Sequence, residues 1–320
     1  MAAAASQLAF GAPARPRRAR ALAAVVALLL RLAVLGPAAI WLVPAARAEP
    51  VVVRDDRGVE QRLAAPPQRI VTMLPSLTET VWVLGAGARL VGVDRYSNWP
   101  PAVARLPHLG GLDDAQIEAI AALRPDVILA STSSRAMDRL QALGFVVVRL
   151  KSETHADVRH TLGLVATLLG TPERGARVWA GIERELDAAA ARVPAAWRGK
   201  SVYFEIGGGP YAAGAGSFIG QTLARLGLVN IVPAALGPFP KLNGEFVVRA
   251  RPDVIMGLRR ELATLAERPG WAALDAVRDA RLCAFDSDDY DMLVRSGPRL
   301  GEAATLLADC LVRLEARAPR

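Results

Sequence analysis

The chain is poor in the residues that usually hold metal ions, with two cysteines and three histidines among 320 residues. The C-x2-C spacing of zinc and redox sites is absent. His155 and His160 are five residues apart, so they do not share a helical face as ligands four residues apart do, and His108 is remote in sequence. This composition disfavours direct capture of a bare metal ion.

Motifs of common enzyme classes are missing as well. There is no Walker A loop and no G-x-S-x-G elbow, because "GAGSFIG" places its serine wrongly. The glycines of "LGAGARLVG" end a predicted helix, whereas a dinucleotide loop follows a strand. The acids of "DDYD" at 288–291 would suit catalysis or calcium, but a solvated loop is the simpler account. We predict a binding protein without a cofactor, and keep an exported α/β hydrolase as the distant alternative.

Acidic residues are absent from the first 48 residues, which hold an arginine-rich start, a long apolar stretch and "ARA" before Glu49. This order is typical of a secretory signal peptide cleaved near Ala48. The alternative is a retained membrane anchor, but Arg31, Gly36 and Pro37 interrupt the apolar stretch. We therefore expect an exported mature protein, and the family resemblance described below implies that it lies in the periplasm of a Gram-negative cell.

The basic character of the chain comes largely from this leader. All six charged residues before Glu49 are arginines, so 33 of the 39 basic residues remain against 31 acidic ones. No basic run with interleaved aromatic residues is left. Nucleic-acid binding is therefore not expected.

The two cysteines lie 27 residues apart, Cys283 in the strand-like "RLCAF" and Cys310 in the helical "LLADCLVRL". An exported protein allows a disulfide between them. Two buried free thiols are the alternative, and the spacing does not decide between the two.

The mature chain divides into an N-terminal hairpin at 49–67, an N-terminal lobe at 68–150, connecting helices at 151–199 and a C-terminal lobe at 200–320. In both lobes strands alternate with helices of about ten residues, which predicts parallel βαβ units. In the first helix, Ser76 and Glu79 have the spacing of a capping box. In the second lobe, 260–277 is predicted as one helix.

The connecting segment contains a single apolar stripe formed by Trp179, Ile182, Leu186, Ala190 and Val193. Such a helix is long enough to run from one lobe to the other. "RPDVI" occurs at 124–128 and again at 251–255, each time after a helix and opening a strand. The predicted fold is therefore α/β, with two Rossmann-like βαβ lobes of similar build, one long backbone helix and a ligand cleft between the lobes.

Three stretches carry a resemblance to a known family: "RIVTMLPSLTETVWVLGAGARLVGVDRYSNWPP", "EAIAALRPDVILA" and "GPRLGEAATLLADCL". Their order and spacing resemble the helical-backbone periplasmic substrate-binding proteins of ABC importers, and most closely the vitamin B12-binding members. The resemblance spans about residues 68–315. It implies a monomer that holds a large metal chelate and delivers it to a permease dimer with its ATPase subunits. Cobalamin or another corrinoid is the implied ligand, with haem or a ferric siderophore as the alternative.

The resemblance also implies roles for individual residues. Glu118 and Glu245 match the acids that meet permease arginines, although each would also suit the first turn of a helix because of the helix dipole. A flat macrocycle is best held by aromatic faces with polar groups at its edge. The expected ligand-binding residues lie on loops of both lobes: Tyr96, Trp99, Tyr211, Phe239, Tyr290, Asp291 and Arg295.

Arg295 is expected to be an unpaired arginine beside the cleft, suited to a phosphate, amide or carboxylate. Leu112 and Ser131 stand where the vitamin B12-binding members have tryptophans, which weakens the case for that ligand. A tyrosine such as Tyr96 or Tyr211 would ligate iron if the ligand were haem.

Overall fold

The computed structural model describes residues 50–317, which lie in one compact unit. The predicted signal peptide at 1–48 falls outside the described residues. Within 50–317, no helix combines the length and the apolar character needed to span a bilayer. The unit begins with an antiparallel hairpin of β1 (Val51–Arg54) and β2 (Glu60–Leu63), as predicted.

The first lobe is a parallel four-stranded sheet in the order β4-β3-β5-β6. β3, β5 and β6 are buried along their whole length, as expected of parallel strands covered on both faces. The elements of this lobe are β3 (Ile70–Thr72), α2 (Pro75–Val81), β4 (Leu90–Val93), α3 (Ile117–Ala122), β5 (Val127–Ser131), α4 (Ala136–Ala142) and β6 (Val147–Leu150).

The second lobe repeats this order with its own strands, β9-β7-β10-β11, and adds the short antiparallel β8 at the end of β7. Its strands are β7 (Ser201–Ile206), β8 (Tyr211–Ala212), β9 (Val229–Asn230), β10 (Val254–Leu258) and β11 (Leu282–Phe285). Its helices are α7 (Phe218–Arg225), α8 (Gly244–Ala250), α9 (Arg259–Leu262), α10 (Asp275–Arg278), α11 (Ser287–Leu293) and α12 (Leu300–Arg317). The predicted α/β fold of two similar lobes is confirmed.

The repeated "RPD" has the same structural role in both lobes. Arg124 and Arg251 have positive φ angles of 46° and 45°, which turn the chain out of the preceding helix. The following aspartate then accepts hydrogen bonds from the beginning of the first strand of its lobe: Asp126 from the backbone N–H of Gln68 and Arg69, which directly precede β3, and Asp253 from that of Ser201 in β7. The motif thus joins the start of β5 to the start of β3 in the first lobe, and the start of β10 to the start of β7 in the second.

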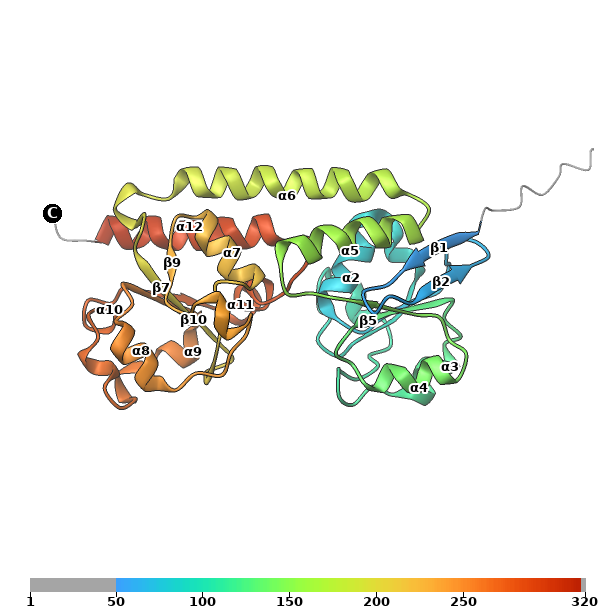
Figure 1. Ribbon diagram of the computed structural model, residues 1–320, viewed down its shortest axis with the longest axis horizontal. Coiled ribbons are helices and arrows are strands. Elements are labelled where there is room, and N and C mark those ends of the chain that lie inside the picture. The colour runs from blue at the N-terminus through green and yellow to red at the C-terminus, as the bar shows by residue number, and fades with distance from the viewer. Residues whose placement is uncertain (1–49, 318–320) are drawn as a thin grey trace, which may run out of the picture. The chain divides into compact units, whose positions relative to one another are not determined.

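Two helices connect the lobes, α5 (His155–Leu168) and the 21-residue α6 (Pro172–Arg192). α6 packs along α5 at one end and along α12 of the second lobe at the other (Figure 1). Trp179, Ile182 and Leu186 of the predicted stripe are buried there. A Cβ atom on Gly175 would lie 2.7 Å from the carbonyl oxygen of Leu162, so this position requires glycine for close packing.

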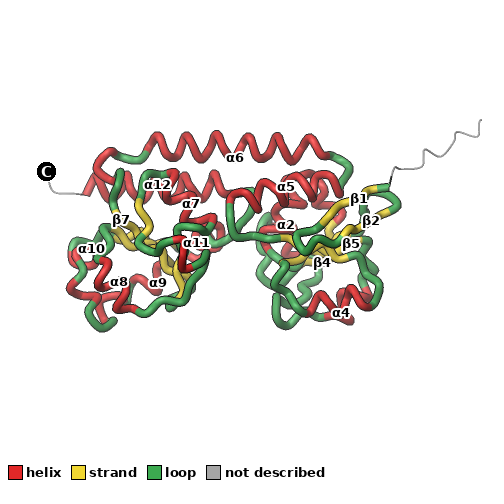
Figure 2. The backbone as a smooth tube through the Cα atoms, in the orientation of Figure 1, coloured by secondary structure: helices red, strands yellow, loops and turns green. Residues whose placement is uncertain are grey.

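Three predicted elements differ in the structure. The predicted helix 260–277 is divided into α9, which already ends at Leu262, two 3-10 turns and α10 (Figure 2), and Pro269 with Gly270 (φ 82°) separates the two 3-10 turns. The capping box at Ser76 is wrong, because Pro75 starts α2 and Leu74 is the N-cap. The acids of 288–291 lie in helix α11 and not in a loop.

The remaining turns are short helical segments: π-helical Trp82–Ala86, and 3-10 turns at Gly87–Arg89, Pro101–Arg105, Ala195–Trp197, Ala234–Leu236, Leu265–Glu267 and Trp271–Ala273. Cys283 of β11 and Cys310 of α12 form a disulfide. It joins the edge strand of the second sheet to the helix that packs against α6.

Candidate ligand-binding cleft

A cleft of about 580 Å³ lies between the lobes. The first lobe contributes the loops that follow β3 and β4, and the second contributes α7, the loop before α8 and the end of α11. Residues that follow parallel strands are the usual ligand-binding positions of such sheets. The lining residues are Leu74, Pro75, Ser76, Arg95, Tyr96, Asn98, Ser152, Phe218, Phe239, Asp291, Val294, Arg295 and Ser296.

Aromatic side chains face the cleft from both lobes. Tyr96 of the first lobe is 63% exposed, the largest exposed fraction among the large hydrophobic side chains of the described residues. In the second lobe Phe218 and Phe239 pack edge to face with ring centroids 5.9 Å apart. Because Phe218 is only 3% exposed, a flat apolar ligand would meet the Tyr96 phenol on one side and Phe239, supported from behind by Phe218, on the other.

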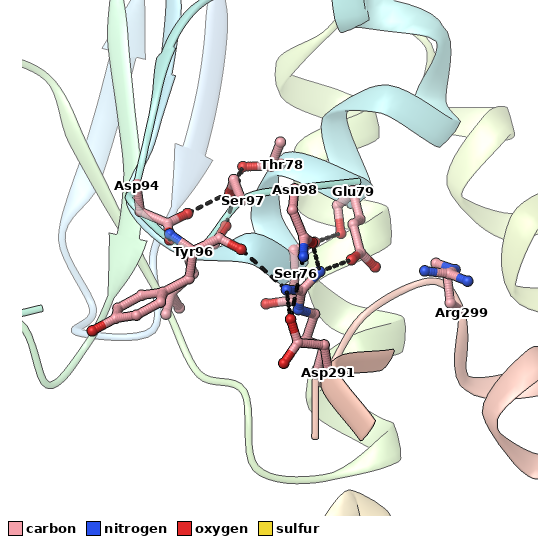
Figure 3. Close-up of polar contacts among 12 residues, drawn as sticks. Ser76, Thr78, Glu79, Asp94, Tyr96, Ser97, Asn98, Asp291 and Arg299 are labelled. Atoms are coloured by element: carbon pink, nitrogen blue, oxygen red, sulfur yellow. Dashed lines mark hydrogen bonds and ion pairs between the residues drawn. The ribbon is translucent and has the colours of Figure 1, made fainter. Parts of the chain in front are cut away.

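A buried chain of hydroxyl groups holds the loop that carries Tyr96. Thr72 of β3 forms a hydrogen bond with Thr78 of α2. Thr78 forms a hydrogen bond with Ser97, whose hydroxyl donates to Asp94 (Figure 3). Asp94 also accepts from the backbone N–H of Tyr96 at 2.8 Å. Burial raises the pKa of Asp94 above its ordinary value. This network fixes where the loop leaves the sheet.

Arg295 lines the cleft but is paired, contrary to the prediction. Its guanidinium donates to Glu79 Oε1 at 3.0 Å, Asp291 Oδ2 at 3.0 Å, Asn98 Oδ1 at 2.8 Å and the carbonyl oxygen of Tyr96 at 3.0 Å. Its side chain is 9% exposed. The second cleft arginine, Arg95, forms an ion pair with Asp114.

Comparison with known proteins identifies the family of this chain. The profile described as periplasmic binding protein matches residues 70–288. The chain belongs to the periplasmic binding protein family.

Relatives of this binding protein cover most of its length. An uncharacterised ABC transporter substrate-binding lipoprotein of Bacillus subtilis, YvrC, is 26% identical over 273 residues, covering 82% of this chain and 85% of the relative. A vitamin B12-binding protein of Pectobacterium carotovorum is 26% identical over 259 residues, covering 78% and 90%. The solved periplasmic haem-binding protein RhuT of Roseiflexus is 27% identical with a TM-score of 0.67, covering 77% of this chain and 98% of that one.

Of the seven predicted ligand residues, four line the cleft of this binding protein: Tyr96, Phe239, Asp291 and Arg295. The guanidinium carbon of Arg299 lies over the Trp99 ring, 4.6 Å from the ring centroid, and Trp99 does not line the cleft. Tyr211 is 49% exposed on β8, also outside the lining set.

Tyr290 is a core residue, contrary to the prediction. It is 7% exposed, and its ring stacks on Phe204. Its hydroxyl accepts from the backbone N–H of Gly207 and donates to the carbonyl oxygen of Glu205. An aromatic residue in an acidic segment looks exposed in the sequence, but it lies on the inner face of α11.

The prediction missed Leu74, Pro75, Ser76, Arg95, Asn98, Ser152, Phe218, Val294 and Ser296. The signal for the first three was available, because they directly follow a predicted parallel strand. Arg95 and Asn98 carry the same signal, since they follow the next predicted strand, whereas the remaining residues have no local signature and are brought to the cleft by the approach of the two lobes.

Leu112 and Ser131, where the resemblance expects tryptophans, have separate environments. Leu112 is 37% exposed and lines a smaller cavity of about 220 Å³, which shares Leu74, Pro75 and Tyr96 with the cleft. Ser131 is 7% exposed and hydrogen-bonds to Ser133. The space beside Tyr96 is therefore open at Leu112.

The two predicted docking acids occupy equivalent positions. Glu118 is in the first turn of α3 and Glu245 in the first turn of α8, and these helices precede the equivalent strands β5 and β10. Both side chains are exposed. Glu118 lies 3.6 Å from Arg139, whereas Glu245 has no ion-pair partner within residues 50–317. Residues 50–317 contain no group of three or more His, Cys, Asp or Glu side chains that could hold a metal ion.

Proposed function

We propose that this periplasmic binding protein captures cobalamin or a related corrinoid in the cleft and delivers it to an ABC permease. The observation that carries the proposal is the charge balance of the cleft. Its two lining arginines, Arg95 and Arg295, are both paired with acidic side chains. No lining cation among the described residues is left to neutralise an anionic ligand.

This balance distinguishes the two ligand classes. Haem carries two propionates, and burying these charges without cations is costly. A corrinoid carries uncharged carboxamides around its ring, which suit neutral partners such as Asn98, Ser152 and Ser296. The similarity to vitamin B12-binding proteins supports the same ligand.

Haem remains the second candidate because of Tyr96. Its phenol is the exposed oxygen ligand that a haem iron in this cleft would use. The similarity to the haem-binding protein RhuT supports this alternative. A ferric siderophore is the remaining chelate class.

The first experiment is titration of residues 49–320 with cyanocobalamin and, separately, with haemin, by tryptophan fluorescence and calorimetry. We expect stoichiometric binding of cobalamin and weak binding of haemin. Tight haemin binding with a tyrosinate-type absorption band that Tyr96→Phe removes would transfer the proposal to haem. Absence of binding with both would overturn it and leave a siderophore.

Docking through Glu118 and Glu245 is part of the proposal. Two exposed acids at equivalent positions of similar lobes suit a permease with two subunits, where they would contribute orientation and association rate. Alanine at both positions should slow uptake into cells without changing ligand affinity. Glu173 and Glu315, exposed acids on α6 and α12, provide the matched control pair. Equal uptake by both double variants would contradict the docking assignment.

We further propose that the protein acts as a monomer in the periplasm after cleavage near Ala48. The acid-free, arginine-rich leader supports export. N-terminal sequencing of protein from the periplasmic fraction tests this, and a first residue other than Glu49 or a close neighbour would contradict it.

A further inference from the structure

Arg295 connects the two lobes at the cleft. It follows α11 in the second lobe, yet three of its four hydrogen-bond acceptors belong to the first lobe: Glu79, Asn98 and Tyr96. Figure 3 labels these three residues together with Asp291, the fourth. The guanidinium is therefore held from both sides of the cleft.

Glu79 is the charged member of this group on the first lobe. Its side chain is 1% exposed and it does not line the cleft, so a ligand would meet Arg295 and not Glu79. Burial raises the pKa of Glu79, while Arg295 and, more weakly, Arg299 oppose that rise, and Glu302 adds to it. A buried carboxylate in this position depends on its arginine partner for stability as an ion.

The position of Glu79 follows from the start of α2. Because Pro75 opens that helix, Ser76 and Glu79 lie inside it and are not used to cap it. The turn after Arg295 packs directly on the same helix, since a Cβ atom on Gly297 would lie 3.1 Å from Cβ of Ser76. The buried Oε2 atom of Glu79 has no hydrogen-bond partner, so its contact with the second lobe is made through Oε1 alone.

We propose that Glu79 is a positioning residue that acts through Arg295: it holds the guanidinium in the cleft and fixes the distance between the two lobes before ligand arrives. The ligand part of this inference rests on the proposed function of the cleft, whereas the lobe spacing does not. The connecting helix α6 joins the lobes on the side of α5 and α12. At the cleft itself the lobes are connected a second time, through the Glu79–Arg295 ion pair and the hydrogen bonds of Asn98 and Tyr96 around it. Two separated connections restrain a hinge that one leaves free, and the ion pair is the charged part of the second connection.

The direct test measures the distance between the lobes without ligand. Spin labels on Leu143→Cys at the end of α4 and Arg249→Cys on α8 report it by pulsed electron paramagnetic resonance, and both sites are exposed. The native cysteines are joined in a disulfide and do not react with the label. Wild type should give one narrow distribution.

Glu79→Ala should shift this distribution to longer distances and widen it. Glu79→Gln keeps the size of the side chain but loses its charge, so its distribution should lie between those of wild type and Glu79→Ala. Glu302→Gln is the matched control. It removes a nearby acid whose ion-pair partner is Arg299 and not Arg295. Unchanged distributions in both Glu79 variants would overturn the proposal. Thermal unfolding of each variant verifies that it is folded, and Arg295→Lys, which loses the planar fork, gives an independent second disruption with the same expected shift.

The second readout is affinity for cyanocobalamin. Glu79→Ala should weaken binding about tenfold or more, mainly through faster dissociation, although Glu79 does not line the cleft. Wild-type affinity in Glu79→Ala would contradict the positioning role. If wild type itself does not bind cobalamin, the proposed function fails, while the lobe distances still decide whether Glu79 fixes the spacing.

Discussion

The disulfide between Cys283 and Cys310 gives a stability prediction that can be worked from the structure. The bond closes a loop of 27 residues between β11 and α12. On the chain-entropy model, such a crosslink lowers the entropy of the unfolded chain by about 12 cal/mol/K, which corresponds to about 3.5 kcal/mol at 25 °C. Removing the bond should therefore cost the folded state about that amount.

The assay is urea unfolding of wild type and of the double variant Cys283→Ala/Cys310→Ala, each with and without a phosphine reductant. With a denaturant slope of about 3 kcal/mol/M, the loss corresponds to a midpoint about 1 M lower. Reductant should lower the midpoint of wild type and leave the double variant unchanged. Both sulfurs are buried, at 0% and 5% exposure, so reduction is expected only as the chain unfolds. A wild-type midpoint that does not respond to reductant would refute the reasoning.

Two further predictions concern stability. Burial raises the pKa of Asp94 above its ordinary value of 3.8. The folded state therefore binds the Asp94 proton more tightly than the unfolded state does, and this adds to the free energy of unfolding. The added stability is fully present below pH 3.8 and is lost as the pH rises through the raised pKa. Urea titrations across that window should show wild type losing stability relative to Asp94→Asn, and a constant difference would count against this. A methyl group on Gly220 of α7 would overlap the carbonyl oxygen of Gly214, so Gly220→Ala should cost about 1–3 kcal/mol. Gly163→Ala in α5, where a methyl group meets nothing within 4 Å, should instead add up to about 1 kcal/mol in the same assay, and equal effects of the two would contradict the packing.

Much of the fold was predictable because it depends on local patterns. The hairpin at 51–63, the buried strands and the long stripe of α6 all have periodicities that one short segment carries by itself. The failure at 260–277 shows the limit of such patterns, because the chain leaves the helix at Leu262 and continues in 3-10 turns on either side of Pro269 and Gly270.

The site was less predictable because its properties depend on partners distant in sequence. Arg295 was expected to be free, and its pairing with Glu79 joins residues 216 positions apart. Asn98 and Asp291, 193 positions apart, are hydrogen-bonded across the same boundary. No periodicity or motif records such a pairing, because it depends on how closely the two lobes approach.

The sequence by itself determined the two similar lobes, since the repeated "RPDVI" places an aspartate where it joins two strand starts within each lobe. It also determined the aromatic residues available for a ligand. Only the tertiary structure decided which of them line the cleft, moving Tyr290 into the core and leaving Tyr96 exposed. The physical reason is that burial and pairing of a charge or ring depend on the packing of distant segments, whereas helix, strand and turn depend mainly on neighbours along the chain.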